Sequence, residues 1–394
     1  MSAPVTEDTT LQHGAKAHSD GGWALVPVQT RSERFSSVDP AEFPEVTGFE
    51  SEWKLTPLVS VRPLIDGPLD GSRYEYLASD ASGVEVSWVG RDDARVGAAG
   101  TPEEKASARA WSSSEAVLAI TVSTETHVEA TVTRSAFGDA ARAAHTIIEA
   151  RPNSVATIVL QNTGAALLSE NVEILVGDGA QLTVVTVQEW DDDAVHLASH
   201  FATVGRDARL RHIVVSLGGS VVRVNPSAHL IAPGADVELF GLYFADAGQH
   251  LEHRVYVEHV AANTRSRVNY KGALNGKGAH TVWVGDVLIG PKAAGTDSYE
   301  QNRNLVLSEG TRADSVPNLE IETGDILGAG HASATGRFDD EQLFYLQARG
   351  ITEREARRLV VLGFLSEIVQ KVDAGALQDR LKLAIENELQ GVDS

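Results

Sequence analysis

A weak repeat in the middle of the chain is the feature that most limits its possible folds. The string Gly179-Ala180-Gln181-Leu182 recurs in related form from Asp207, from Gly234 and, more faintly, from Asn263, at spacings of 28, 27 and 29 residues. Each copy begins with a residue type that tolerates a left-handed backbone. A nearly constant period of this length, without helices between the strands, favours a stacked β-solenoid.

The composition around the repeat is typical of strands. Residues 143–325 are rich in Val, Ile, Thr and Leu in short runs, and Gly, Asn and Asp separate these runs. An antiparallel β-sandwich remains the alternative at this point, because its hairpin turns also recur. If the solenoid is right, Gly179, Asp207, Gly234 and Asn263 lie near one line along the stack.

The segments on either side of this region differ from it in composition and apolar pattern. Residues 1–45 are polar and weakly patterned, which predicts a flexible N-terminus, and residues 46–142 predict a mixed, partly helical region. The β core is expected over 143–338. From 339 to 394 the apolar period changes to that of helices, which predicts a C-terminal helical domain.

The C-terminal domain carries a clear helix start. Thr352-Glu353-Arg354-Glu355 is a capping box, and the helix that it begins is expected to reach about Val372 with one apolar face. Helices with such narrow apolar stripes must pack on the β body, on each other or on a partner.

The charge and the missing cysteines exclude several classes of function. Lys and Arg number 33 against 55 Asp and Glu, so the net charge is −22. This charge disfavours nucleic acids and anionic membranes as partners. With no cysteine, the chain has no disulfides, thiolate ligands or cysteine nucleophiles. The N-terminus has no signal-peptide pattern, and a cytoplasmic location is expected.

Motifs for known chemistry are mostly missing. The chain contains no complete phosphate-binding loop, no Gly-x-Ser-x-Gly and no His-Glu-x-x-His. His250, His253 and His259 cluster in the sequence, but on a strand His250 faces the opposite side from the other two. Structural roles for these histidines are therefore favoured over a metal site.

One histidine lies at the junction between the β segment and the helical tail. His331 follows Gly330 and precedes Ala332, and these small neighbours leave the imidazole uncovered. The pattern alone favours an ordinary surface histidine, with a functional role as the alternative.

Three motifs follow one another around this junction. They are Pro317-Asn318-Leu319-Glu320-Ile321, His331-Ala332-Ser333-Ala334-Thr335-Gly336 and Asp340-Glu341-Gln342-Leu343-Phe344-Tyr345-Leu346-Gln347-Ala348-Arg349-Gly350-Ile351. In this order they closely resemble the SufB/SufD family of iron–sulfur cluster assembly proteins. Weaker matches are Gln301 to Ser308, Glu52 to Thr56, and the spacing of His259 with Thr264 and Ser266.

The resemblance implies a fold and a set of partners. Members of this family have a right-handed parallel β-helix flanked by helical domains, so the chain is expected to be mainly β with helical regions at both ends. B-type and D-type subunits pair through their β-helices, and each carries an ABC-type ATPase on its C-terminal domain. The predicted ATPase-binding residues are Phe344, Tyr345, Arg349, Ile351 and Phe364.

The resemblance also assigns a role to His331. Cluster assembly in the family is attributed to the interface between a B-type cysteine and a D-type histidine. Because this chain lacks cysteine, it resembles the D-type subunit, and His331 falls on the D-type histidine. His331 is thus a candidate ligand for a transient iron ion or iron–sulfur cluster.

Two departures from the family pattern bear on this role. Ala329 stands where family members often have cysteine, and Ala332 replaces the family's glycine. This chain therefore offers only nitrogen or oxygen ligands, and the thiolates must come from the partner. No cofactor is expected to stay bound to the chain alone.

These observations predict a non-catalytic scaffold subunit that assembles with a B-type paralogue and an ABC-type ATPase. One alternative is a β-helix enzyme acting on polysaccharide, which needs a pair of carboxylates along one groove. Another is a B-type subunit working as a homodimer, and the missing cysteines count against it.

Overall fold

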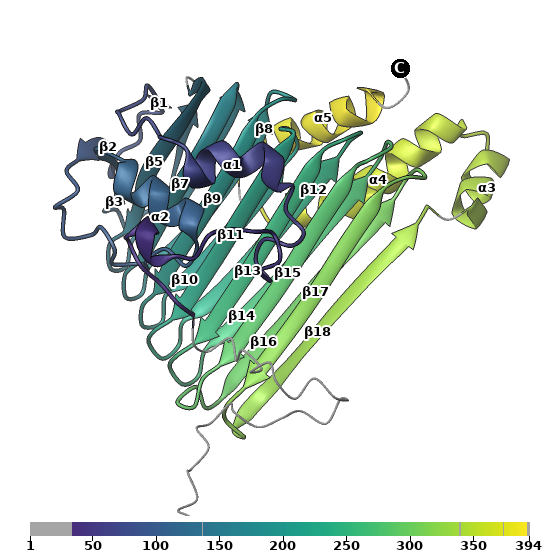
Figure 1. Cartoon of the computed structure of the whole chain (residues 1–394). Coiled ribbons are helices and arrows are strands. Elements are labelled where there is room, and N and C mark those ends of the chain that lie inside the picture. The colour runs from purple at the N-terminus through teal and green to yellow at the C-terminus, as the bar shows by residue number, and fades with distance from the viewer. Residues whose placement is uncertain (1–33, 136, 339, 373, 392–394) are drawn as a thin grey trace, which may run out of the picture. The chain divides into compact units, whose positions relative to one another are not determined.

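Two long β-sheets dominate the computed structural model, which describes residues 34–135, 137–338, 340–372 and 374–391 (Figure 1). Both sheets belong to the unit that runs from Ser36 onward. Each sheet has nine strands within the described residues. Sheet 1 consists, in spatial order, of β1 (Leu77–Ala78), β4 (Val128–Arg134), β6 (Val155–Gly164), β8 (Gln181–Trp190), β10 (Arg209–Ser216), β12 (Asp236–Ala245), β14 (Arg265–Leu274), β16 (Thr296–Val306) and β18 (Ile326–Arg337).

Sheet 2 holds the intervening strands, so the chain passes from one sheet to the other at almost every turn. Its order is β17 (Arg312–Ile321), β15 (His280–Ile289), β13 (His250–His259), β11 (Val221–Leu230), β9 (Val195–Val204), β7 (Ala166–Val176), β5 (Gly138–Ala150), β3 (Val117–Val122) and β2 (Val84–Val89).

The strands within each sheet pair in parallel, apart from the antiparallel pairs β1–β4 and β2–β3 at the N-terminal end. Most parallel neighbours lie two strands apart in the chain and align residue for residue, as in β10 with β12. This is a parallel β-solenoid, so the predicted fold class is confirmed and the sandwich alternative is wrong. Parallel pairing already starts with β3 and β4, upstream of residue 143, because β3 is a short, almost continuous apolar run and β4 alternates between apolar and polar residues.

The repeated turn residues form one line, as predicted. The backbone N–H of Gly179 donates to Arg206 O, that of Asp207 to Pro233 O, and that of Gly234 to Asn263 O. The line also includes Asn153 and Gly295, and all six residues have a positive φ between 52° and 79°.

Asn or Asp alternates with glycine along this line. A Cβ added at Gly179 would lie 2.4 Å from Asn153 Oδ1, and one added at Gly234 would lie 2.0 Å from Asp207 Oδ1. Each Asx side chain therefore occupies the space that the next glycine leaves open. We call these six residues, Asn153, Gly179, Asp207, Gly234, Asn263 and Gly295, the Asx–Gly line.

We expect Gly234→Ala to destabilise the chain by about 2–3 kcal/mol in urea unfolding. The substitution forces a side chain into left-handed backbone, which costs about 1–2 kcal/mol, and adds a clash with Asp207. Gly248→Ala is the matched control, because Gly248 also has φ +79° but no atom within 4 Å of an added Cβ. Equal losses for the two variants would show that the contact with Asp207 contributes nothing.

The core lies between the two sheets. Alternate residues of each strand point inward, as strand geometry requires, and Ile120, Leu182, Val237 and Val257 are among those that meet there. The inward positions thus form a column of aliphatic residues from one turn to the next.

Helices cover the outer faces of both sheets (Figure 1). The short 3₁₀ helix Pro40–Glu42 precedes α1 (Leu58–Asp66) and α2 (Lys105–Ser113), which lie on sheet 2. The predicted flexible stretch 1–45 falls largely outside the described residues.

At the C-terminus come α3 (Asp340–Ala348), α4 (Glu353–Val369) and α5 (Gly375–Gly391). Helix α4 begins as predicted, with Thr352 Oγ1 accepting from Glu355 N at 3.3 Å. The apolar faces of α4 and α5 pack on the outer face of sheet 1, where Val361 and Leu365 meet Val215 and Phe240. Among the described residues, none of these helices is long and apolar enough to cross a membrane.

Candidate functional site

Both sheets end in a strand that has no neighbour on its outer side within the described part of the chain. These strands are β17 in sheet 2 and β18 in sheet 1. Several large apolar side chains are exposed at this end, notably Leu327, which is 81% exposed, with Tyr299, Val316 and Ile321. The other end of sheet 1 is closed differently, by the antiparallel strand β1.

His331 lies in the middle of the edge strand β18. It is exposed, as predicted, and it pairs in register with Glu300 of β16, which pairs in turn with Val268 of β14. In-register neighbours of a parallel sheet point to the same face, and Val268 belongs to the core. His331 therefore continues an inward-facing row of side chains at the point where the solenoid is open.

Polar side chains occupy the inner face beside this row. Asn302 Nδ2 donates to Tyr243 Oη at 2.8 Å, Tyr243 Oη donates to Asn304 Oδ1 at 2.7 Å, and Ser315 Oγ donates to Asn302 Oδ1 at 2.5 Å. Asn304 Nδ2 also lies 3.4 Å from Thr335 Oγ1 on the edge strand. The aliphatic core thus gives way to a hydrogen-bonded polar lining next to His331.

The carboxylate next to His331 was not predicted from the sequence. Glu300 is 1% exposed, and a Cβ added at Gly285 would lie 2.4 Å from its Oε2, so the carboxyl group reaches across toward sheet 2. The solenoid period is the signal that finds it, because Glu300 lies 31 residues, one turn, before His331. An imidazole and a carboxylate are both good ligands for iron. Within the described ranges, no three His, Asp or Glu side chains come close enough to hold a metal ion.

The three clustered histidines separate into different environments. His253 accepts or donates a hydrogen bond with Ser216 Oγ at 3.0 Å, inside the solenoid, and burial lowers its pKa to about 3. His259 uses both ring nitrogens, at 2.7 Å from Thr264 Oγ1 and 2.9 Å from Ser266 Oγ. These contacts give a structural reason for the spacing noted in the sequence. His250 lies on the outer face of β13, as strand parity predicts.

The predicted partner-binding residues of the tail lie in three different environments. Phe344 is 72% exposed and Tyr345 is 56% exposed, and Arg349 stacks over the Tyr345 ring at 4.5 Å. Ile351 is half-buried just before α4. Phe364 instead packs against the helix–sheet core, with Lys271 Nζ 4.8 Å from its ring centre.

A buried ion network was also not predicted. Arg134 donates to both carboxylate oxygens of Glu170, at 2.6 and 2.9 Å, and His196 Nε2 lies 2.8 Å from Glu170 Oε1. Trp190 Nε1 donates to His196 Nδ1 at 3.2 Å, so His196 Nε2 carries the proton that goes to Glu170. Although burial raises the pKa of Glu170, the Arg134 charge and the hydrogen bonds hold it well below its usual range.

Comparisons with known proteins agree with this architecture. The family model described as SUF system FeS cluster assembly, SufBD core domain, matches residues 132–364. An iron–sulfur cluster assembly SufBD family protein of Mycobacterium leprae (strain TN) is 48% identical over 365 residues, covering 90% of this chain and 93% of that protein.

Further relatives carry the same family name. One from Mycobacterium tuberculosis (strain ATCC 25618 / H37Rv) is 47% identical over 374 residues, covering 92% of this chain and 94% of that protein. A second Mycobacterium leprae protein is 30% identical over 207 residues, covering 52% of this chain and 24% of that protein. With a family model over more than half of its length and relatives matched nearly end to end, the chain belongs to the SufBD family of iron–sulfur cluster assembly proteins.

Proposed function

We propose that this chain is a D-type, non-catalytic scaffold subunit of a cytoplasmic complex that builds iron–sulfur clusters. It pairs with a B-type paralogue through the edge strands β17 and β18, and it binds an ABC-type ATPase through its C-terminal helices. The observation that carries the proposal is an exposed histidine, His331, on an open edge strand of a chain without cysteine.

The open edges support pairing with a protein of the same kind. An edge strand presents backbone N–H and C=O groups to a further strand, and exposed Leu327 and Val316 add apolar surface there. Mycobacterium leprae has two SufBD family proteins, related to this chain at 48% and 30% identity. A second, less similar family member is what a heterodimer of paralogues requires.

His331 supplies one ligand at such an interface. A neutral imidazole binds iron alongside thiolates, and this chain has no thiolate of its own. The cluster, or its iron, is a transient cargo held between His331 and cysteines of the paralogue. The buried carboxylate of Glu300 lies one strand behind His331 and adds an oxygen donor to the same inner face.

The polysaccharide alternative finds less support. Carboxylates on the outer face of sheet 2 are engaged within the fold: Glu252 Oε1 lies 2.5 Å from Arg254 Nε, and Glu173 Oε1 lies 2.9 Å from His145 Nε2. A glycosidase needs two carboxyl groups facing a sugar across a groove.

Leu327→Glu tests the pairing edge. We expect this charge on the open edge to weaken binding of the purified B-type paralogue by at least about tenfold, or 1.4 kcal/mol, in calorimetric titration. Leu77→Glu is the control, because Leu77 is 75% exposed on β1 at the opposite edge of the same sheet. If Leu327→Glu binds the paralogue as tightly as wild type, β18 is not part of the interface.

Phe344→Ser tests the ATPase surface. The exposed ring on α3 suits an apolar groove of a partner, so we expect the variant to lose most of the ATPase that co-purifies with the wild-type chain. Leu383→Ser is the control, with a side chain 57% exposed on α5. Because α4 and α5 cover sheet 1, removal of the tail would also expose that sheet. Point substitutions test the docking surface without this effect. Unchanged co-purification would exclude α3 as the docking helix.

A further inference from the structure

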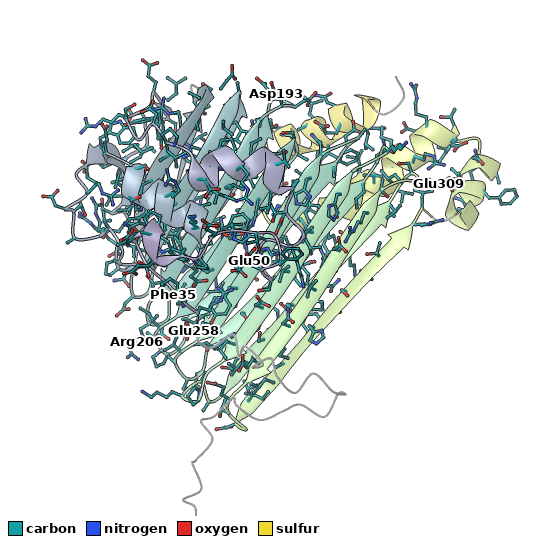
Figure 2. The ribbon with its side chains drawn as sticks, viewed as in Figure 1. Phe35, Glu50, Asp193, Arg206, Glu258 and Glu309 are labelled. Carbon is teal, nitrogen blue, oxygen red and sulfur yellow. The ribbon has the colours of Figure 1, made fainter. Side chains whose placement is uncertain are left out.

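Four titratable side chains form a row across three neighbouring strands on the outer face of sheet 2. Glu252 Oε2 lies 3.0 Å from His250 Nε2 on β13, and His250 Nδ1 lies 3.1 Å from His280 Nδ1 on β15. His280 Nε2 then lies 2.7 Å from Asp314 Oδ2 on the edge strand β17. Figure 2 labels Glu258, which lies on the same outer face of β13. We call the four residues the His–His row.

The number of protons that this row needs follows from its acceptors. Ionised carboxylates only accept hydrogen bonds, so each Nε2 must carry a proton to satisfy Glu252 and Asp314. The contact between the two Nδ1 atoms then needs one proton, because two lone pairs repel and so do two N–H groups. All three hydrogen bonds form only when the two rings together carry three protons, one more than two neutral imidazoles hold.

Charged groups on every side keep both carboxylates ionised. Arg254 Nε lies 2.5 Å and Arg223 Nε 3.5 Å from Glu252 Oε1, and Thr56 Oγ1 donates to Glu252 Oε2 at 2.8 Å. Glu104, in turn, pairs with Arg223 at 2.6 Å. At the other end, Arg312 Nε lies 2.8 Å from Asp314 Oδ2.

The row is mostly shielded from water. The side chain of His250 is 7% exposed and that of His280 is 19% exposed. Burial lowers the pKa of His280, the bond to Asp314 partly offsets this, and the neighbouring His250 lowers it further. Although burial raises the pKa of Asp314, the bonds from His280 and Arg312 leave it below its usual value.

We propose that His250 and His280 share one proton, and that this proton makes the attachment of the edge strand β17 sensitive to pH. The row connects the edge strand β17 to the ion pairs of Glu252, which Thr56 also contacts. The protonation state of the row therefore affects how firmly β17 is held at the open end of the solenoid. This inference concerns the isolated chain and stands apart from the partners proposed above.

The sign of the effect follows from proton uptake. In the unfolded chain His280 binds a proton as the pH falls through about 6.5, whereas in the folded chain burial and the neighbouring His250 lower its pKa. The unfolded state therefore binds more protons, and stability falls as the pH drops from about 6.5 through the lowered pKa of His280. Above the window in which the pair holds three protons, the central hydrogen bond is lost instead.

Nitrogen-15 NMR of the histidine rings tests the shared proton directly. We expect the pair to take up its protons in two steps separated by at least about two pH units, as strongly coupled groups do. His229 is the reference ring, because its Nδ1 lies 2.7 Å from a carboxylate oxygen of Glu258 on the same face. Single-step titration of His250 and His280 would overturn the proposal.

Hydrogen exchange tests the consequence for β17. After correction for the intrinsic rate, we expect protection of the β17 amides to fall about tenfold between pH 7 and pH 5.5, corresponding to a coupling of about one pKa unit. His280→Asn should remove this pH dependence, and His229→Asn should retain it. A fall of equal size in His280→Asn would overturn the link to β17.

A metal ion is the competing occupant of the gap between the two Nδ1 atoms. Zn²⁺ alone, added to the full chain, distinguishes it. If the protein retains one equivalent of Zn²⁺ through gel filtration and neither ring then titrates, the gap is a metal site and the shared proton is wrong. Two-step titration that persists with Zn²⁺ present supports the proton.

Discussion

Replacing His331 with alanine should reduce iron–sulfur cluster assembly on the reconstituted complex by more than about tenfold, since even outer-shell changes at metal sites cost 10–100-fold. Folding should stay within about 0.5 kcal/mol of wild type, because the side chain is exposed on the edge strand. Cluster formation is followed by the visible absorbance of the assembled complex, and folding by urea unfolding of the isolated chain.

Two further variants serve as controls for the His331→Ala result. His127→Ala removes another exposed histidine, just before β4 and far along sheet 1, and should assemble clusters normally. His331→Asn keeps a local hydrogen-bonding group but offers a poor iron ligand. Wild-type assembly by both His331 variants would exclude a ligand role, and loss of subunit pairing in His331→Ala would assign the residue to the interface instead.

Glu170→Ala should destabilise the isolated chain by about 3–5 kcal/mol, the range expected when one partner of a buried ion pair is removed. Arg134 would remain buried with its charge uncompensated, and His196 would lose its acceptor. Urea unfolding at pH 7 measures the loss. Glu258→Ala, which removes the half-exposed partner of His229, should cost less than about 1 kcal/mol.

The same carboxylate predicts part of the acid sensitivity of the fold. Because the folded pKa of Glu170 is depressed, its stabilising effect is complete above the unfolded value of about 4.3 and is lost as the pH falls below it. The unfolding free energy of Glu170→Gln should therefore fall less steeply than that of wild type below pH 4.3. Parallel pH profiles for the two proteins would contradict the depressed pKa.

The repeat is the sequence feature that favours the solenoid, and the strand pairing then excludes the sandwich that the repeat alone left open. The turn residues need left-handed backbone, and that requirement leaves Gly, Asn or Asp in the sequence at a nearly constant spacing. The exposure of His331 follows from its small neighbours, and the start of α4 follows from Thr352. Each of these features depends on residues close together in the chain.

The features that the sequence does not predict depend on contacts between distant residues. Arg134 of sheet 1 pairs with Glu170 of the facing sheet 2. Phe364 packs toward sheet 1, where it contacts Lys271 and the helix–sheet core. His250 and His280 meet because strands two apart in the chain align in register. Register is set by the lengths of the intervening turns, which vary here from copy to copy, so composition and local pattern do not reveal it.

The Asx–Gly line also sets how the length of such a solenoid can change. Asn153, Asp207 and Asn263 each cover a glycine in the following turn, so each turn that carries Asn or Asp needs a glycine turn after it. Removing the single turn that contains Gly234 would place Asp207 directly before Asn263, whose Cβ would enter the space of the Asp207 carboxylate. Loss or duplication of two turns keeps every side chain opposite a glycine. Relatives of this chain that lack one turn along this part of the stack should therefore lack a turn that carries Asn or Asp, whereas loss of a glycine turn should be accompanied by loss of a neighbouring Asx turn.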